Sequence, residues 1–401
     1  MGAGIAWNFI PALGVQTTPQ PVSIHYPLNS SSTTLYGTPN TTGSNGAGAK
    51  QSLPTSLSQV NVSSQQWINY AQVAWSFFKP GIGVSPSTGL IYASPYWHEF
   101  TDWDLAGYIQ AVLAAERIGL ISESGPWGAD YRLSLVLNFL DTRALNSNGL
   151  WYQFYNSDSG TVSADGLNDP GGISDGGPML IALYDLMQAH PRFTSQVREA
   201  VTRVNYKLLA SQGFGPDLYS QYAKLGFDLW NFSSSSSDVY PLSVGNMAIS
   251  EPAMLAILEN THSMDFERAG QEIYSAQYAA YNRTGDLFAL SEGQYPPYLN
   301  STTPYVYESI EVPSGKNYQV ITWQGQTINS SPEDFVKIGF AFLAIYRSSY
   351  GELLVNTLGN LTTSDGYSEG LLSQTGQVFG AVSDNTNIMI MLACAYGFSH
   401  D

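Results

Sequence analysis

From Ser64 to the end of the chain, apolar residues recur at the spacing of one helix face, and segments rich in glycine and polar residues separate these runs. One run places Leu105, Ile109, Val112 and Leu113 on a single face before Gly119. The pattern predicts helices over residues 64–79, 102–119, 127–145, 175–189, 193–211, 218–230, 250–259, 266–281, 332–350 and 384–396, with a short helical turn ending at 358.

A strand-like alternation of apolar and polar residues appears in one part of the chain. The runs 305–312 and 317–323 are joined by a Pro-Ser-Gly-Lys turn, which predicts a β-hairpin. Alternation would place Glu308 on the face opposite Tyr305 and Tyr307. Residues 366–381 are predicted to form a loop.

Residues 1–64 differ in composition from the rest of the chain. From residue 16 this segment is rich in Ser, Thr, Pro, Gly and Asn, and Lys50 is its only Lys or Arg. Such a composition buries little apolar surface, so we expect an extended arm or linker before one domain over residues 65–401. The arm is also a candidate for self-association with a neighbouring copy.

The predicted helices are roughly a dozen, of ordinary length, and no short sequence repeat accompanies them. One large domain with so many helices is typical of a mainly α protein, an (α/α)6 toroid in which inner helices alternate with outer ones. We expect the small β-hairpin and the N-terminal arm to be additions to this toroid. The long loops are expected to gather on one functional face.

Composition and charge exclude some classes of partner. The formal net charge of the 401-residue chain is −17, and charged residues make up only 12%. Binding to nucleic acid needs clustered Lys and Arg, so no nucleic-acid partner is expected. Aromatic residues reach 13%, including 26 Tyr and 9 Trp. The single cysteine, Cys394, lies in an apolar run and is expected to be a buried, inert side chain.

Sequons and charge predict a protein that works outside the cell or at the cell surface. An Asn-x-Ser/Thr pattern begins at Asn29, Asn40, Asn61, Asn231, Asn282, Asn300, Asn329 and Asn360. Low charge and an acidic balance without disulfides suggest a secreted glycoprotein of an archaeal or acid habitat. The apolar start, interrupted by Pro11, is too short to span a bilayer, and no membrane span is expected in this chain.

The entrance to the predicted helix at 102 combines two carboxylates with a large aromatic, Asp102, Trp103 and Asp104, and Trp97 precedes them. A carboxylate at a helix N-terminus is favoured by the unpaired N–H groups, which is the structural alternative for both aspartates. Aromatics beside carboxylates are also what a sugar-binding cleft requires.

Several motifs resemble one family, the domain of unknown function 3131. They run in order from about residue 64 to the end and include Trp103-Asp-Leu-Ala-Gly-Tyr, Ser174-Asp-Gly-Gly-Pro-Met-Leu, Ile249-Ser-Glu-Pro, Gly366-Tyr-Ser-Glu-Gly and Asp384-Asn-Thr-Asn-Ile. The resemblance implies an (α/α)6 fold similar to that of glucoamylase-like and β-1,2-glucanase domains. On this toroid the resemblance implies an inverting glycoside hydrolase.

Glycoside hydrolysis requires one carboxyl group to protonate the leaving oxygen and a second to activate water or attack. Partly by analogy, we expect Glu251 to be the proton donor, with an apolar wall from Ile249 and Pro252 favouring its protonated form. Asp104 and Asp175 are ranked ahead of Asp384 as the base. Asp175 and Glu251 each begin a helix, so stabilisation of a helix N-terminus is the alternative for both.

Flat aromatic faces bind sugar rings, so the exposed-loop aromatics are candidate platforms, with core packing as the alternative for each. The expected platforms are Trp97, Trp103, Trp151, Tyr155 and Trp230. Further contacts with substrate are expected from Glu308, Tyr367, Glu369 and Asp384.

The sequence contains no motif typical of a metalloprotease, a phosphate-binding loop or a serine hydrolase. The histidines His25, His98, His190, His262 and His400 are scattered, and no zinc-protease, phosphate-binding or GxSxG motif is present. No metal or other cofactor is expected, although structural calcium held by Asp165 and Asp169 stays open.

Two functions therefore remain. The first is an extracellular glycoside hydrolase that acts on an oligo- or polysaccharide or a surface glycan. The second is a non-catalytic glycan-binding or cell-envelope filament protein that keeps the toroid.

Overall fold

The computed structural model describes residues 58–164, 169–233, 246–261, 263–294, 305–322, 325–329 and 331–401. Six of its helices form a closed ring in which each contacts the next. In ring order they are α2 (Asp102–Arg117), α4 (Ile173–Ala189), α7 (Leu218–Leu229), α8 (Glu251–Leu258), α10 (Val336–Tyr346) and α12 (Asp384–Ser399). Within the ring, α10 and α12 bury nearly every side chain, which explains their continuous apolar sequences.

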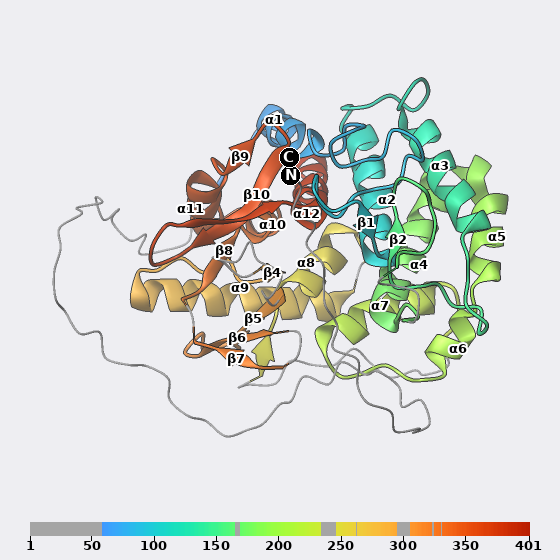
Figure 1. The fold of residues 1–401 in the computed structure, drawn as a ribbon. Helices are drawn as coiled ribbons and strands as arrows, with labels where there is room; N and C mark the ends of the chain where they lie inside the picture. Colours follow the sequence, from blue (N-terminus) through green and yellow to red (C-terminus); the bar gives the residue numbers. More distant parts are fainter. Residues whose placement is uncertain are drawn as a thin grey trace, which may run out of the picture.

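A second set of helices packs outside the ring. Within the described ranges these are α1 (Ser64–Trp75), α3 (Ala129–Thr142), α5 (Thr194–Arg203), α9 (Met264–Thr284) and α11 (Ser349–Leu358). Figure 1 shows α3 and α5 on the outer side of α2 and α4. Outer and inner helices alternate along the chain from α1 to α5 and from α8 to α12, and the six-membered ring confirms the predicted (α/α)6 toroid. The segment directly before α8 includes residues 234–245, which lie outside the described residues.

Glycines allow two inner helices to approach closely. A Cβ added to Gly226 of α7 would lie 2.0 Å from the carbonyl oxygen of Gly177 of α4, and one on Gly177 would lie 2.2 Å from Cα of Ala223. The missing side chains therefore let α4 and α7 pack backbone against backbone.

Two antiparallel sheets lie against the ring. In the first, β5 (Tyr305–Glu311) pairs with β6 (Tyr318–Thr322) on one side and with β3 (Met247–Ala248) and β4 (Glu292–Gln294) on the other. The strand β7 (Thr327–Ile328) extends this sheet beyond β6. The predicted hairpin is thus confirmed and belongs to a larger sheet, and burial alternates along β5 so that Glu308 is buried opposite the tyrosines.

The second sheet corrects the predicted loop over 366–381. It contains β10 (Gly366–Leu372) between β11 (Val378–Val382) and β8 (Glu333–Phe335), with β9 (Thr362–Thr363) also paired to β10. Consecutive residues at the start of β10 are all buried, so its sequence has no strand-like alternation to detect. A two-residue pair, β1 (Glu99–Phe100) and β2 (Tyr155–Asn156), completes the strands of the described ranges.

Two predicted helices are each divided. The segment 193–211 is divided into α5 and α6 (Tyr206–Ala210), because Asn205 leaves the helix and caps α6 by accepting from the N–H of Leu208. A 3₁₀ turn, η1 (Pro191–Phe193), directly precedes α5. The segment 332–350 begins as strand β8, and α10 ends where Arg347 adopts a left-handed φ of 45°. Ser348 then caps α11.

The described end of the N-terminal arm touches the toroid. Gln59 forms a β-bridge with Ser348, and Val60 donates to the carbonyl of Arg347. The rest of the arm, residues 1–57, and the sequons at Asn29, Asn40 and Asn300 lie outside the described residues. Among the helices that the structure describes, none has both the length and the apolarity to cross a bilayer.

Candidate functional site

Carboxylates from four inner helices meet at the end of the ring where these helices begin. Asp104 is in the first turn of α2, Asp175 in that of α4, and Glu251 and Asp384 are the first residues of α8 and α12. These are the four acids that the sequence offered as donor and base, and the ring brings them to the same end. The helix dipoles favour negative charge at this end.

Asp104 belongs to this acidic group and also takes part in capping the helix α2. Its Oδ2 accepts from the backbone N–H of Thr101 at 2.7 Å and from the Thr101 hydroxyl at 3.0 Å, which closes a capping box at the start of α2. Burial and the adjacent charge of Asp104 raise the pKa of Asp384 well above its ordinary value. Burial also raises the pKa of Asp104, while the hydrogen bonds from Thr101 lower it in part, so the two carboxyl groups titrate as a pair.

Asp175 lies next to them and, within the part of the chain that the structure describes, forms no ion pair with a Lys or Arg. Burial and then the charges of Asp102 and Asp104 raise its pKa to about 8. Asp102 is fully buried and paired with the guanidinium of Arg143. Asp102 is therefore part of the scaffold under the site rather than the helix cap, a position that Thr101 occupies.

Glu251 is surrounded by hydrogen-bond donors, so the apolar wall predicted from Ile249 and Pro252 is wrong. The ammonium of Lys337 lies 2.5 Å from Oε2, and the Ser291 hydroxyl donates to the same oxygen at 2.8 Å. Asn385 donates to Oε1 at 2.9 Å. The buried Glu251 carboxyl group therefore has one cation and two further hydrogen-bond donors as partners.

A fifth carboxyl group, Glu292 on β4, stands beside this ion pair. Its side chain is 7% exposed, and Oε2 accepts from the hydroxyl of Tyr219 at 2.5 Å. Burial and then the charge of Glu251 raise the pKa of Glu292 to about 8, while Lys337 and hydrogen bonds from Tyr219 and Tyr305 lower it in part. Glu292 is thus a carboxylic acid that keeps its proton at neutral pH.

Partly exposed aromatic rings adjoin the carboxyl groups. The ring centroid of Trp103 lies 5.8 Å from that of Tyr219, Tyr219 lies 6.3 Å from Tyr307, and Tyr307 lies 5.6 Å from Tyr305. Burial and then the carboxyl groups of Glu292, Asp175 and Glu251 raise the pKa of Tyr307, which locates this ring near both groups of acids. Trp97 is partly exposed in the loop that also accepts, through Ala93, from the N–H of Asp384.

Five other predicted contact residues do not reach this surface. Trp151 and Tyr155 are fully buried, the latter donating its hydroxyl to the carbonyl of Ala144, and Tyr367 is 1% exposed against Phe340. Trp230 ends α7, at the opposite end from the acids, and donates to the carbonyl of Leu180. Glu308 is fully buried on the inner face of β5. These predictions are wrong, because the sequence cannot show which face of a loop or strand enters the core.

Glu369 is near the site but is largely covered. It is 8% exposed on β10, and its Oε2 lies 3.3 Å from where a Cβ of Gly293 would be. The small residue beside Glu292 therefore makes room for this carboxyl group. Burial is the main cause that raises the pKa of Tyr305, and the charge of Glu369 adds to it.

Sequence reasoning missed Tyr219, Glu292, Lys337 and Asn385. Lys337 carried a usable signal, since it is a cation within the otherwise apolar run 336–346 and needs a buried partner. Asn385 follows Asp384 directly, while nothing in the sequence near Glu292 or Tyr219 distinguishes them. Of the two residues offered for calcium, Asp165 lies outside the described residues.

The comparisons with known proteins agree with the fold. A family model described as "Protein of unknown function (DUF3131)" matches residues 69–243 and 238–399. The search of curated proteins found no match.

Several solved structures are similar to the chain. An endo-β-1,2-glucanase from Chitinophaga pinensis is 12% identical, with 84% of this chain and 95% of that chain covered and a TM-score of 0.57. An endo-β-1,2-glucanase from Talaromyces funiculosus is 13% identical over 84% and 87%, with a TM-score of 0.57. A glucoamylase from Saccharomycopsis fibuligera is 10% identical over 85% and 97%, with a TM-score of 0.53. At these identities the likeness concerns the fold.

Proposed function

The chain belongs to the DUF3131 family, and we propose that it is a glycoside hydrolase that acts on a polysaccharide or surface glycan outside the cell. The observation that carries the proposal is the gathering of Asp104, Asp175, Glu292 and Asp384 with Trp103 and the site tyrosines at one end of the ring. Similar folds include endo-β-1,2-glucanases and a glucoamylase, which supports this reaction class by analogy.

Glu292 has the properties of the proton donor. With a pKa of about 8 it is protonated at neutral pH, and the hydroxyls of Tyr219 and Tyr305 hold its carboxyl group in place. In this scheme Glu292 gives its proton to the glycosidic oxygen as the bond to the anomeric carbon breaks. The role that the sequence suggested for Glu251 passes to Glu292, because Lys337 pairs with the Glu251 carboxylate.

Glu251 and Lys337 act as positioning residues. The negative charge of Glu251 favours the protonated form of Glu292 before the reaction. Once Glu292 has lost its proton, the Lys337 ammonium stabilises the new carboxylate, since its charge already acts on this group. The ion pair therefore keeps the donor's proton affinity in a useful range.

Asp104 is the proposed base. Burial raises the pKa of Asp104, but the two hydrogen bonds that Thr101 donates lower it in part and the N-terminus of α2 adds favourable partial charge, so we assign the negative charge of the Asp104–Asp384 pair to Asp104. An ionised carboxylate opposite a protonated acid is the arrangement that an inverting enzyme requires, with water activated on the far face of the sugar.

The aromatic side chains provide the surface for the sugar. Trp103, Tyr219, Tyr305 and Tyr307 are partly exposed and form a continuous series of ring contacts. Their apolar faces suit the C–H faces of pyranose rings, and their hydroxyl groups suit sugar hydroxyls.

The test is reducing-sugar release from a panel of α- and β-linked glucans, beginning with β-1,2-glucan. We expect Glu292→Gln and Asp104→Asn each to lower kcat by about 10²- to 10⁴-fold. The matched control is Glu259→Gln, a buried carboxyl with a pKa of about 8 at the other end of the ring, which should leave kcat unchanged. NMR of the first product anomer then distinguishes inversion from retention.

Lack of activity of the wild-type protein on every glycan would overturn the proposal. In that case, binding of a glycan to the wild type but not to Trp103→Ala would support the alternative, a non-catalytic glycan-binding protein. Equal activity of the wild type and Glu292→Gln would remove Glu292 as donor while leaving the hydrolase itself in place.

A further inference from the structure

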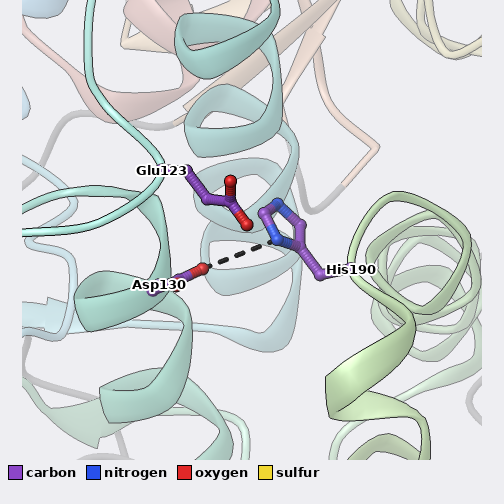
Figure 2. A group of neighbouring side chains, drawn as sticks. All are labelled: Glu123, Asp130 and His190. Carbon is purple, nitrogen blue, oxygen red and sulfur yellow. Dashed lines mark ion pairs between the residues drawn. The ribbon is translucent and has the colours of Figure 1, made fainter.

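A second group of chemically capable side chains lies at the opposite end of the ring, where α2 and α4 end. Glu123 comes from the loop after α2, Asp130 from the first turn of α3, and His190 from the residue that ends α4. One ligand atom from each lies within 4.8 Å of the others. Figure 2 shows the three side chains pointing toward one another from three separate segments.

The hydrogen bonds of His190 set its tautomer. The imidazole is 5% exposed, and Nε2 lies 2.8 Å from Oε2 of Glu116. Because a carboxylate only accepts, Nε2 carries the hydrogen. Nδ1 lies 2.9 Å from Nη2 of Arg192, and because a guanidinium only donates, Nδ1 presents its lone pair to Arg192, with Oδ1 of Asp130 3.6 Å from the same nitrogen.

This is the arrangement that proteins use to prepare a metal-binding histidine. One ring nitrogen faces the site as a lone-pair donor, and a carboxylate holds the other nitrogen and fixes the ring's orientation. His190 and Glu116 reproduce both parts, on the adjacent helices α4 and α2.

Arg192 supplies the positive charge that the group requires. Its guanidinium lies 3.0 Å from Oε1 of Glu123, pairs with Asp130 and donates to Nδ1 of His190. These are the same three side chains that would ligate a metal ion. The Arg192 side chain is 43% exposed, so it can turn into solvent without leaving a buried charge unpaired.

A cavity opens beside the group. It has a volume of about 270 Å³, and Glu116, Glu123 and His190 contribute to its lining. The cavity gives an ion a path to the ligands and leaves room for water to complete the coordination shell.

We propose that Glu123, Asp130 and His190 bind a divalent transition metal, with Zn²⁺ the best match, in competition with the guanidinium of Arg192. One imidazole nitrogen and two carboxylate oxygens form a three-ligand set for zinc, and water fills the fourth position. Calcium prefers an all-oxygen shell and fits less well. The bound ion would join the loop after α2, the start of α3 and the end of α4, and so stabilise this end of the toroid.

The experiment titrates chelator-treated, full-length protein with Zn²⁺ and follows binding by calorimetry, with Tm as a second readout. We expect one ion per chain, an increase in Tm, and at least a 100-fold loss of affinity in His190→Ala. Co²⁺ in place of Zn²⁺ should give visible absorption bands that the same variant loses. The matched control is His98→Ala, because His98 pairs with a single carboxylate, Asp158, and this variant should bind as the wild type does.

Two further variants separate a metal site from a structural ion-pair network. Arg192→Gln should bind Zn²⁺ more tightly, because the competing cation is gone, whereas loss of a purely structural residue would not raise affinity. Glu116→Gln should weaken binding about 10- to 100-fold. Glu123→Gln changes a 60% exposed side chain and tests the ligand set without a risk to folding.

The proposal would be overturned if His190→Ala and Glu123→Gln bound Zn²⁺ with the same affinity as the wild type. Weaker binding of Zn²⁺ by Arg192→Gln would also overturn it. None of these measurements depends on glycan hydrolysis, so the metal site and the proposed hydrolase activity are tested independently.

Discussion

The ammonium nitrogen of Lys337 lies 2.5 Å from Oε2 of Glu251, and the two residues are 2% and 0% exposed. They come from neighbouring inner helices, α10 and α8, and Asn385 of α12 donates to the same carboxylate. The buried ion pair and the Asn385 hydrogen bond thus connect three helices of the ring close to the proposed proton donor, Glu292. Removal of the ion pair should affect both folding and the acidity of Glu292.

Removal of the cation alone should be costly. In Lys337→Met the Glu251 carboxylate stays buried without its partner, and we expect a loss of about 3–5 kcal/mol in the free energy of unfolding. The double variant Lys337→Met with Glu251→Gln should be more stable than Lys337→Met, because no unpaired charge remains. Urea unfolding followed by tryptophan fluorescence measures both. A loss below about 1 kcal/mol in the single variant would show that water reaches the carboxylate.

The glycine contact between α4 and α7 predicts a second stability effect. A methyl group at Gly226 would meet the carbonyl oxygen of Gly177 at 2.0 Å, so the helices must separate in Gly226→Ala. We expect a loss of about 3 kcal/mol, at the upper end of typical overpacking effects. Gly172→Ala is the control, since its nearest neighbour, the Ser174 hydroxyl oxygen, is 3.7 Å away. If the two variants unfold at the same urea concentration, the close approach of these helices is incorrect.

Buried carboxyl groups predict that the protein is more stable in acid. Burial is the main cause that raises the pKa to about 8 in Asp175 and Glu292 and to about 9 in Glu333, from ordinary values of 3.8 and 4.5. At pH values between the ordinary and the raised pKa of each group, the native chain holds a proton that the unfolded chain releases. Rising pH therefore favours unfolding, by up to about 1.4 kcal/mol per pH unit for each group.

Thermal unfolding at a series of pH values checks this sign. We expect Tm to fall steadily as the pH rises from about 5 to 8, with the largest stability near the ordinary carboxyl pKa values. A Tm that is constant or rises over this range would mean that these carboxyl groups are ionised in the native protein.

Glu333 allows the same effect to be assigned to one residue. Its side chain is fully buried, neither carboxyl oxygen has a hydrogen-bond partner among the described residues, and burial followed by the charge of Glu369 raises its pKa. Glu333→Gln cannot titrate, so the fall in Tm between pH 5 and pH 8 should be smaller than in the wild type. The comparison of slopes is independent of any fixed packing cost of the amide. An unchanged slope would indicate that Glu333 is ionised at both pH values.

Local patterns determined much of the fold and part of the candidate site. Helical periodicity located every inner helix, because a helix in a closed ring must bury a face or, like α10, its whole surface. The acids Asp104, Asp175 and Asp384 could be predicted because a carboxylate at a helix start has a local signature. The strand β10 was missed because its buried residues do not alternate.

The sequence by itself determined the helical ring and the acid-rich helix starts, since periodicity and capping depend on residues close together in the chain. Only the tertiary structure decided that Glu251 faces Lys337, that Glu292 accepts from Tyr219, and that Trp151 and Tyr155 lie in the core. The environment of a buried side chain is made by residues distant in sequence, and the closure of the ring determines which of them meet.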